Sequence, residues 1–519
     1  MNRRSRTQNS LINMGVGFAG YLINTLMGFV CRMVFVRCLP AEYLGISGLF
    51  SNILSMLSLA ELGIGTAIGY ALYKPLANRD ENKIAALMQF YGSAYRIIGI
   101  VVGCIGIVVL PFLPYLVGDT SYIKESIHLI YSVYLFNTSI TYFFSYKSTL
   151  LFADQKNYIC IGVSYAITTI QSIVQIVFLI ITKDYLIYIF IQTIGTFVYN
   201  IIISYIASKQ YPYIKDKTVQ KLDRDEKKTL LGNIKALTVT RLSEYLVNGI
   251  DNIIISLFDG IVAVGAASNY TLFSGTLSTL TNQIFNSLTA SVGNYNALNS
   301  ADEQYKFFKK LQLANFMIFG WAAIGIMLVS SDLVKLCFGE GYVLPPLIPF
   351  VLALNFYLVT MQSAVRTFRS TLGLFRYGQY ILIFTAALNL LFSIFFGRLW
   401  GLFGIYLATA VARILTICWY FPYAVFLHGF KRSPIEYLIL YFKYLVILLI
   451  DGIICYTFCN MISCSLPLQV ILKIIVCSFV PNFTLFLLYR RTDEYKYLSR
   501  KTVELIKSII SRLRSRKVE

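Results

Sequence analysis

Apolar segments long enough to cross a lipid bilayer follow one another along almost the whole chain. A transmembrane helix needs ~20 mostly apolar residues, and by that criterion the sequence predicts about fourteen such helices. They lie near Leu11–Val36, Leu44–Ala67, Ile97–Leu116, Ile127–Leu150, Ile159–Ile181, Leu186–Tyr205, Leu237–Leu257, Ile261–Ser287, Leu311–Val334, Phe350–Thr367, Tyr380–Phe396, Leu402–Phe421, Tyr437–Phe458 and Leu468–Leu488. The pattern predicts an all-α polytopic membrane protein.

Positive charge gathers on one side of this arrangement. With the N-terminus in the cytoplasm, 35 of the 45 lysines and arginines lie on the cytoplasmic side and five lie in external loops. The other five lie within the predicted helices, at Arg32, Arg96, Arg241, Arg413 and Lys473. Because cytoplasmic loops carry the excess of Lys and Arg, we expect both termini in the cytoplasm and the protein in the bacterial inner (cytoplasmic) membrane.

Composition agrees with a membrane protein. Hydrophobic residues make up 57% of the chain and charged residues only 13%, which is far from the composition of a soluble domain. A net charge of +20 would suggest nucleic acid as the partner of a soluble protein. Here the positive-inside topology and attraction to anionic lipids explain the charge, so we expect membrane lipids and no nucleic acid as partners.

A short motif occurs twice in the chain. Lys147–Leu150 (KSTL) recurs as Arg369–Leu372 (RSTL), 222 residues later. The residues 222 positions after Leu76, Asp80 and Glu81 are also identical to them. Six predicted helices separate the copies, and because six is even, both copies have the same membrane orientation. This indicates a parallel repeat of two six-helix bundles, followed by two further helices.

The repeat suggests five parts. They are an N-terminal six-helix bundle (1–208), a cytoplasmic basic linker (209–235), a C-terminal six-helix bundle (236–428), two additional transmembrane helices (429–489) and a cytoplasmic basic tail (490–519). Within Val503–Lys517 of the tail, Ile506, Ile509, Ile510 and Leu513 share one helical face and basic residues flank it. That pattern suits a helix on the inner leaflet, and equally a short cytoplasmic helix.

Polar residues line up along single faces of several predicted helices. In the seventh helix, a stripe within roughly 100° holds Arg241, Glu244, Asn248, Asp251 and Asn252. Further polar positions are Asn24, Arg32, Glu61, Asn282, Arg366, Arg369 and Arg413. Polar groups are costly inside a bilayer, so the stripes predict a hydrated cavity at the interface of the two repeats. A salt-bridge network in the seventh helix and simple helix packing elsewhere are the alternatives.

The sequence argues against an enzyme. Its only histidines, His128 and His428, lack any pattern for nucleophilic or metal chemistry. It has no glycine-rich phosphate loop, and its ten cysteines lack metal-ligand spacing. We therefore expect no catalytic residue, metal or cofactor, apart from a coupling proton or sodium ion. The alternative in a different class is a membrane-embedded polysaccharide polymerase or glycosyltransferase, which would usually need a larger charged external loop.

One segment carries a family resemblance. Leu39–Phe50 (LPAEYLGISGLF), followed by Glu61–Ile68 (ELGIGTAI), strongly resembles the polysaccharide-repeat-unit flippases. These form the polysaccharide transporter branch of the superfamily that also contains multidrug and toxin extruders and lipid II flippases. The resemblance covers the whole chain in helix number, repeat and tail positions.

The resemblance implies a V-shaped pair of helix bundles that work by alternating access. Their substrate would be an oligosaccharide linked to undecaprenyl pyrophosphate, moved to the outer leaflet for surface polysaccharide assembly. A polysaccharide polymerase and chain-length machinery would be partners, and capsule, O-antigen and teichoic-type polymers all remain open.

The candidate residues suit such a substrate by type. Pyrophosphate requires cations, which makes the arginines candidate headgroup contacts, while amides suit sugar hydroxyls. The substrate-binding candidates are Arg32, Arg241, Arg366, Arg369, Arg413, Asn24, Asn248 and Asn282. Glu61, Glu244 and Asp251 are candidate ligands of a coupling ion, or charge partners.

Two transporters of the same fold are the alternatives. A multidrug exporter would need an acidic, apolar cavity for cationic substrates, and the five arginines disfavour it. A lipid II flippase shares the carrier lipid and the need for cations. The segment Pro40–Gly48 favours the polysaccharide branch over it.

Overall fold

The computed structural model describes residues 6–61, 64–117, 123–154, 156–216, 222–228, 230–232, 234, 238, 251–374 and 377–515. Side chains before residue 20 and after residue 504 are outside this description. Within these ranges every regular element is helical, which confirms the all-α polytopic class. The chain divides into two compact units, Met1–Ala266 and Ala267–Glu519.

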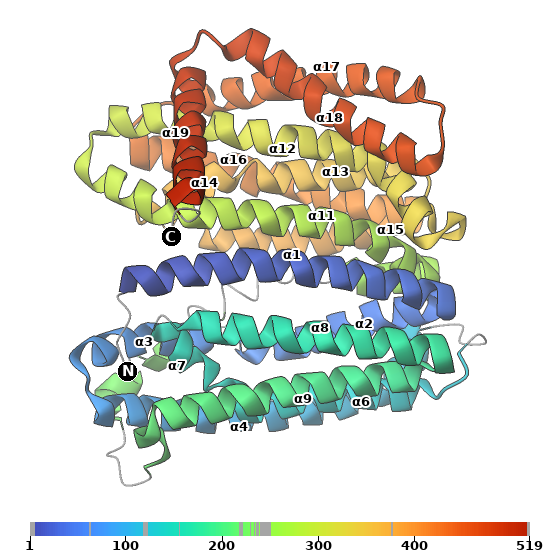
Figure 1. Ribbon diagram of the computed structural model, residues 1–519, viewed down its shortest axis with the longest axis vertical. Helices are drawn as coiled ribbons and strands as arrows, with labels where there is room; N and C mark the ends of the chain where they lie inside the picture. Colours follow the sequence, from blue (N-terminus) through green and yellow to red (C-terminus); the bar gives the residue numbers. More distant parts are fainter. Residues whose placement is uncertain are drawn as a thin grey trace. The chain divides into compact units, whose positions relative to one another are not determined.

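The first unit is a bundle of long helices that run side by side (Figure 1). Its elements before the linker are α1 (Arg6–Cys38), α2 (Ala41–Leu57), η1 (Ser58–Glu61), α3 (Ile64–Asn78), α4 (Glu81–Val109), η2 (Leu110–Phe112), α5 (Leu113–Val117), α6 (Ile127–Ser145), α7 (Ser148–Ala153), α8 (Asn157–Thr182), α9 (Tyr185–Gln210) and η3 (Pro212–Lys215). α1 packs along α8, and α6 packs against both α4 and α9. Tyrosine rings fill much of the core, and Tyr91, Tyr131 and Tyr185 are fully buried.

The second unit begins within α11 (Asp251–Leu298), which starts in the first unit. Its other elements are α12 (Ala301–Phe338), η4 (Glu340–Tyr342), α13 (Leu347–Thr360), α14 (Ser363–Thr371), α15 (Gln379–Leu415), α16 (Ile417–Ala424), the π-helical η5 (Val425–Phe430), α17 (Ile435–Asn460), α18 (Leu466–Tyr489) and α19 (Asp493–Ser515). α12 contacts α13, α17, α18 and α19, and the core beside it contains Phe308, Phe319 and Phe368. α19 crosses the direction of the long helices (Figure 1).

Nine stretches of the described residues are long and apolar enough to cross a membrane. They are Glu81–Val117, Asn157–Thr182, Tyr185–Gln210, Asp251–Leu280, Ala301–Phe338, Leu347–Thr371, Tyr380–Phe430, Ile435–Asn460 and Leu466–Tyr489. The eleventh and twelfth predicted helices lie together in Tyr380–Phe430, joined at Gly401, whose φ of 55° interrupts the helix. Because the seventh predicted helix falls largely outside the described residues, the number fourteen stays a prediction.

The repeated motif has the same local role in both units. In the first unit, Thr149 accepts or donates a hydrogen bond with Tyr91 at 3.1 Å. Its methyl group would lie 3.6 Å from a Cβ placed on Gly69. In the second unit, Thr371 accepts a hydrogen bond from Asn296 at 2.8 Å, and its methyl group would lie 3.6 Å from a Cβ on Gly293. Each threonine thus hydrogen-bonds its short helix to a neighbouring helix and lies close to a glycine.

The segment Leu39–Phe50 forms a joint at the start of α2. A Cβ on Gly45 would lie 2.0 Å from the carbonyl oxygen of Ile261, so α2 and the beginning of α11 cross at close range. The Tyr43 hydroxyl hydrogen-bonds to the Glu125 carboxylate, and Ser47 accepts a hydrogen bond from Tyr134 at 3.1 Å. Small residues permit such close crossings inside membranes.

Candidate functional site

Arg413 lies on α15 inside the second unit, with only 6% of its surface exposed. Its Nη1 donates to Oδ1 of Asn355 at 2.7 Å. Asn355 in turn donates from Nδ2 to the carbonyl of Tyr406 at 2.8 Å. A buried guanidinium is costly unless it is hydrogen-bonded, so Asn355 both satisfies and orients Arg413.

Arg366 and Arg369 lie about one turn apart on α14, a short helix that follows a break after α13. The carbonyls of Thr360 and Met361 at this break accept hydrogen bonds from Nδ2 of Asn315, at 3.2 and 3.0 Å. Carbonyls at a helix end need such outside donors. A polar side chain on α12 thereby fixes the direction in which α14 leaves the break.

The three candidate arginines of this unit, Arg366, Arg369 and Arg413, converge on α16. Arg366 and Arg413 both interact electrostatically with Cys418, and the guanidinium of Arg369 lies 4.3 Å from the ring centroid of Phe421. Arg366 also donates to the Val359 carbonyl at 3.2 Å, and Arg369 donates to the Tyr377 carbonyl, in the loop that follows α14, at 3.1 Å. These hydrogen bonds to backbone carbonyls hold the guanidinium groups of Arg366 and Arg369 in place.

In the first unit, Asn24 and Arg32 lie on α1, about 80° apart around the helix. Both side chains are half-buried. Arg32 is close enough to Tyr188 on α9 to interact with it electrostatically. Among the described residues, Oδ1 of Asn24 is buried without a hydrogen-bond donor.

Glu61 has three tyrosines as neighbours, Tyr91, Tyr95 and Tyr142. The Tyr95 hydroxyl donates to Oε1 of Glu61, and Tyr142 also hydrogen-bonds to this carboxylate. The rings of Tyr91 and Tyr95 pack edge to face with centroids 4.4 Å apart. Glu61 itself is the last residue of the 3-10 turn η1, which follows α2. Two phenol donors therefore contact a half-buried carboxylate at the end of this turn.

The remaining candidates divide into two groups. Asp251 lies in the first turn of α11, and Asn282 is exposed on the same helix. Arg241, Glu244 and Asn248 lie outside the described residues. The polar stripe of the seventh predicted helix therefore stays a prediction.

A buried polar cluster in α15 was not anticipated from the sequence. Oδ1 of Asn389 accepts hydrogen bonds from Ser393 at 3.2 Å and from Thr409 at 3.1 Å, and Thr385 donates to Thr416 at 2.8 Å. All five side chains are at most 2% exposed. The sequence signal for this cluster was a polar residue at every fourth position, at 385, 389 and 393. The cluster holds together the two halves of α15 on either side of Gly401.

Sequence reasoning also missed two intramembrane carboxylates. Asp332 on α12 pairs with Lys473 on α18, with 2.6 Å between Oδ2 and Nζ. Asp451 on α17 is 1% exposed. Lys473 stands out in the sequence as a cation within an apolar segment, and ionisable residues at such positions normally have partners. Only the fold identifies Asp332 as that partner.

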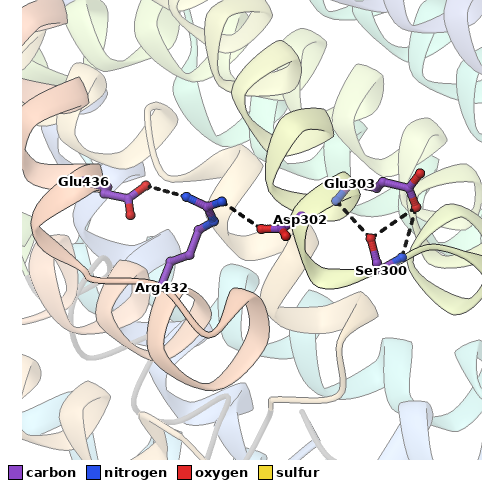
Figure 2. Close-up of polar contacts among 5 residues, drawn as sticks. All are labelled: Ser300, Asp302, Glu303, Arg432 and Glu436. Carbon is purple, nitrogen blue, oxygen red and sulfur yellow. Dashed lines mark hydrogen bonds and ion pairs between the residues drawn. The ribbon is translucent and has the colours of Figure 1, made fainter.

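A polar network ties together one end of the second unit (Figure 2). Ser300 caps α12 in a capping box with Glu303. Arg432 donates to Asp302 at 2.7 Å and to Glu436 at 3.4 Å, which joins the start of α12 to the start of α17. The hydrogen bond to Asp302 raises the pKa of Arg432 above its ordinary value. In the part of the chain that the structure describes, no group of three His, Cys, Asp or Glu side chains could hold a metal ion.

Comparison with known proteins identifies the family. A match to the family described as polysaccharide biosynthesis protein covers residues 10–292, which is more than half of the chain. The chain therefore belongs to this family. No curated protein matches this sequence.

Solved structures show the same fold. The chain is similar to the lipid II flippase MurJ in an inward closed conformation, with a TM-score of 0.64 and 15% identity over 91% of this chain and 98% of that chain. It is also similar to an inward-facing multidrug resistance MATE family transporter of the MOP superfamily (TM-score 0.55, 15% identity, 77% of this chain, 94% of that chain). A MATE transporter from Vibrio cholerae gives a TM-score of 0.52 at 15% identity over 81% of this chain and 96% of that chain. The protein is thus a multi-pass membrane protein whose fold is shared with these solved structures.

Proposed function

We propose that the protein is a flippase for undecaprenyl-pyrophosphate-linked oligosaccharide repeat units. It moves them across the bacterial cytoplasmic membrane by alternating access, for surface polysaccharide assembly. The observation that carries the proposal is membership of the polysaccharide biosynthesis family in a chain with a transporter fold. The positioned arginines of the second unit supply the charge that a pyrophosphate headgroup requires.

Each candidate residue has a defined task in this proposal. Arg32 and Arg241 from the first half, with Arg366, Arg369 and Arg413 from the second, contact the pyrophosphate through charge-assisted hydrogen bonds. Asn24, Asn248 and Asn282 contact sugar hydroxyls. The polyprenyl tail stays in the lipid.

The protein acts as a secondary transporter and makes or breaks no covalent bond. Both termini lie in the cytoplasm, as the distribution of Lys and Arg predicts. A polysaccharide polymerase and chain-length machinery receive the flipped units. A proton or a sodium ion couples the cycle through Glu61, Glu244 or Asp251.

A reconstituted flipping assay separates this proposal from its rivals. The purified protein is placed in proteoliposomes with fluorescent undecaprenyl-pyrophosphate-linked oligosaccharide, and a membrane-impermeant quencher reports headgroups that change leaflet. Parallel vesicles carry lipid II or a cationic amphiphilic dye. We expect faster exchange of the oligosaccharide than of either competitor, with its chain length unchanged. A preference for lipid II would instead indicate a lipid II flippase, and a preference for the dye would indicate a multidrug exporter. Extension of the oligosaccharide chain would indicate a polymerase or glycosyltransferase.

Arginine variants test the headgroup contacts in the same vesicles. Arg32→Ala and Arg241→Ala should each slow the initial rate at least about tenfold, because a hydrogen bond to a charged group contributes ~1.5–3 kcal/mol. Lys at either site should restore only part of the rate, since an ammonium cannot grip phosphate bidentately. Arg398→Ala, an exposed arginine in a predicted external loop, is the matched control. If both alanine variants transport the oligosaccharide as fast as this control, the proposed cationic headgroup site is wrong.

A further inference from the structure

The beginning of α19 is fixed firmly to the end of the helical bundle. Glu494 forms an ion pair with Lys309 on α12 at 3.1 Å. Burial raises the pKa of the Glu494 carboxyl, but hydrogen bonds to the backbone and to Lys309 leave it below its ordinary value. The ring of Tyr497 lies 4.5 Å from the ammonium of Lys310. Tyr495 and Leu498 pack against the core of the unit.

From this attachment α19 runs across the ends of the spans instead of continuing along them (Figure 1). The spans α12, α17 and α18 are long enough to cross a membrane, so the direction across their ends is the plane of the membrane surface. α19 has 23 residues and is therefore about 35 Å long. The contacts with Lys309 and Lys310 on α12 come from its first two turns.

The sequence continues the same apolar stripe along the rest of the helix. At 100° per residue, Ile506, Ile509 and Leu513 fall within about 40° of Tyr495, although their side chains lie outside the described residues. Val503, at the edge of this stripe, is 47% exposed. The stripe thus extends well beyond Leu498, which packs against the core of the unit.

Cations flank this stripe on both sides. The sequence places Lys496, Lys507 and Arg514 about 100–120° to one side, and Lys501 and Arg512 about as far to the other. Lys496 and Lys501 are exposed, and so are Arg490 and Arg491 at the end of α18. Basic residues at the margins of an apolar face are typical of helices that lie in the interface of an anionic bilayer.

We propose that the second half of α19 binds the surface of an anionic phospholipid bilayer. Its apolar stripe enters the boundary between headgroups and acyl chains, and the flanking cations contact lipid phosphates. The ion pair to Lys309 and the packing of Tyr495 hold the helix at the level of that surface. Charge complementarity selects lipid over a second copy of this strongly basic chain, which would be repelled.

Hydrogen exchange of the full-length protein in lipid nanodiscs tests this inference. The amides of residues 505–515 are followed in nanodiscs of phosphatidylglycerol and in nanodiscs of phosphatidylcholine. We expect roughly tenfold slower exchange in phosphatidylglycerol, because each cation near an anionic surface adds to binding, and a smaller difference at high salt. Exchange that is equally slow in both lipids would show that α19 rests on protein, and exchange that is equally fast would show that it is unbound. Either result overturns the proposal.

A charge-reversal pair provides the matched control. Lys507→Glu with Arg514→Glu should abolish the dependence on lipid charge. Arg224→Glu with Lys228→Glu changes the net charge equally at exposed positions of the predicted linker, and should leave the dependence intact. If both pairs respond alike, the effect belongs to overall charge and not to α19.

Discussion

At the scale of single residues, Glu61 is the coupling candidate with the best-defined surroundings. Its carboxylate receives hydrogen bonds from Tyr95 and Tyr142 and lies where η1 ends. A conformational change that moves η1 relative to Tyr95 and Tyr142 would alter these hydrogen bonds, which would connect the Glu61 carboxylate to the transport cycle.

We expect Glu61→Gln to uncouple transport from the ion gradient. In proteoliposomes with an imposed proton or sodium gradient, the variant should bind the headgroup but flip it at a rate that the gradient no longer changes. Tyr95→Phe removes one donor and should only weaken the gradient effect. Glu340→Gln, an exposed carboxylate in η4, is the control. A normal gradient response of Glu61→Gln would transfer the coupling role to Glu244 or Asp251.

Residue types in the candidate site are easier to predict from sequence than their partners. Arg413 and Lys473 stand out because they interrupt apolar segments. Their partners Asn355 and Asp332 lie 58 and 141 positions away, and local periodicity carries no information on such distances. Asn389 and Ser393 went unnoticed because neutral polar residues four apart are also common in simple helix packing.

At the scale of helices, the apolar pattern predicts where the helices lie better than it predicts where one helix ends and the next begins. The segments predicted at 380–396 and 402–421 both exist, but a single glycine at position 401 joins the first of them directly to the next. The hydropathy of a segment indicates burial in lipid, but it contains no information on the backbone angles at the end of the segment. In the same way, α13 ends at Thr360 inside a segment predicted as a single helix, and Asn315 on α12 satisfies the carbonyl of Met361 at this break.

The close crossing of α2 and α11 leads to a prediction about the motif Leu39–Phe50. Gly45→Ala should destabilise the first unit by about 1–3 kcal/mol, the usual cost of overpacking, because its Cβ would overlap the Ile261 carbonyl. Gly48→Ala is the matched control, since its Cβ would lie 3.4 Å from Val264 in ordinary contact. The midpoint of thermal unfolding in detergent compares them. Equal midpoints for the two variants would contradict the crossing.

At the scale of the whole molecule, the length of α12 connects the fold to the charge distribution. Its 38 residues make a helix about 57 Å long, while the apolar core of a bilayer is only ~30 Å thick. The excess lies at the polar start of the helix, which carries Asp302, Glu303 and Lys309. The capping box, the Arg432 bridge (Figure 2) and α19 all gather at this end, as expected for the side of the membrane that holds most of the cations.

The topology that follows from this charge distribution can be tested with thiols. Cys464 is exposed in the short connection between α17 and α18, which the sequence places outside the cell. A membrane-impermeant maleimide should therefore label Cys464 in intact cells. In a Cys464→Ser background, Ser5→Cys and Lys517→Cys should be labelled only after the membrane is permeabilised, because both termini are predicted in the cytoplasm. External labelling of one terminus alone would require an odd number of spans and would overturn the parallel repeat. External labelling of both termini, with Cys464 protected, would show that the whole molecule has the opposite orientation. The distribution of lysine and arginine would then have predicted the wrong side of the membrane.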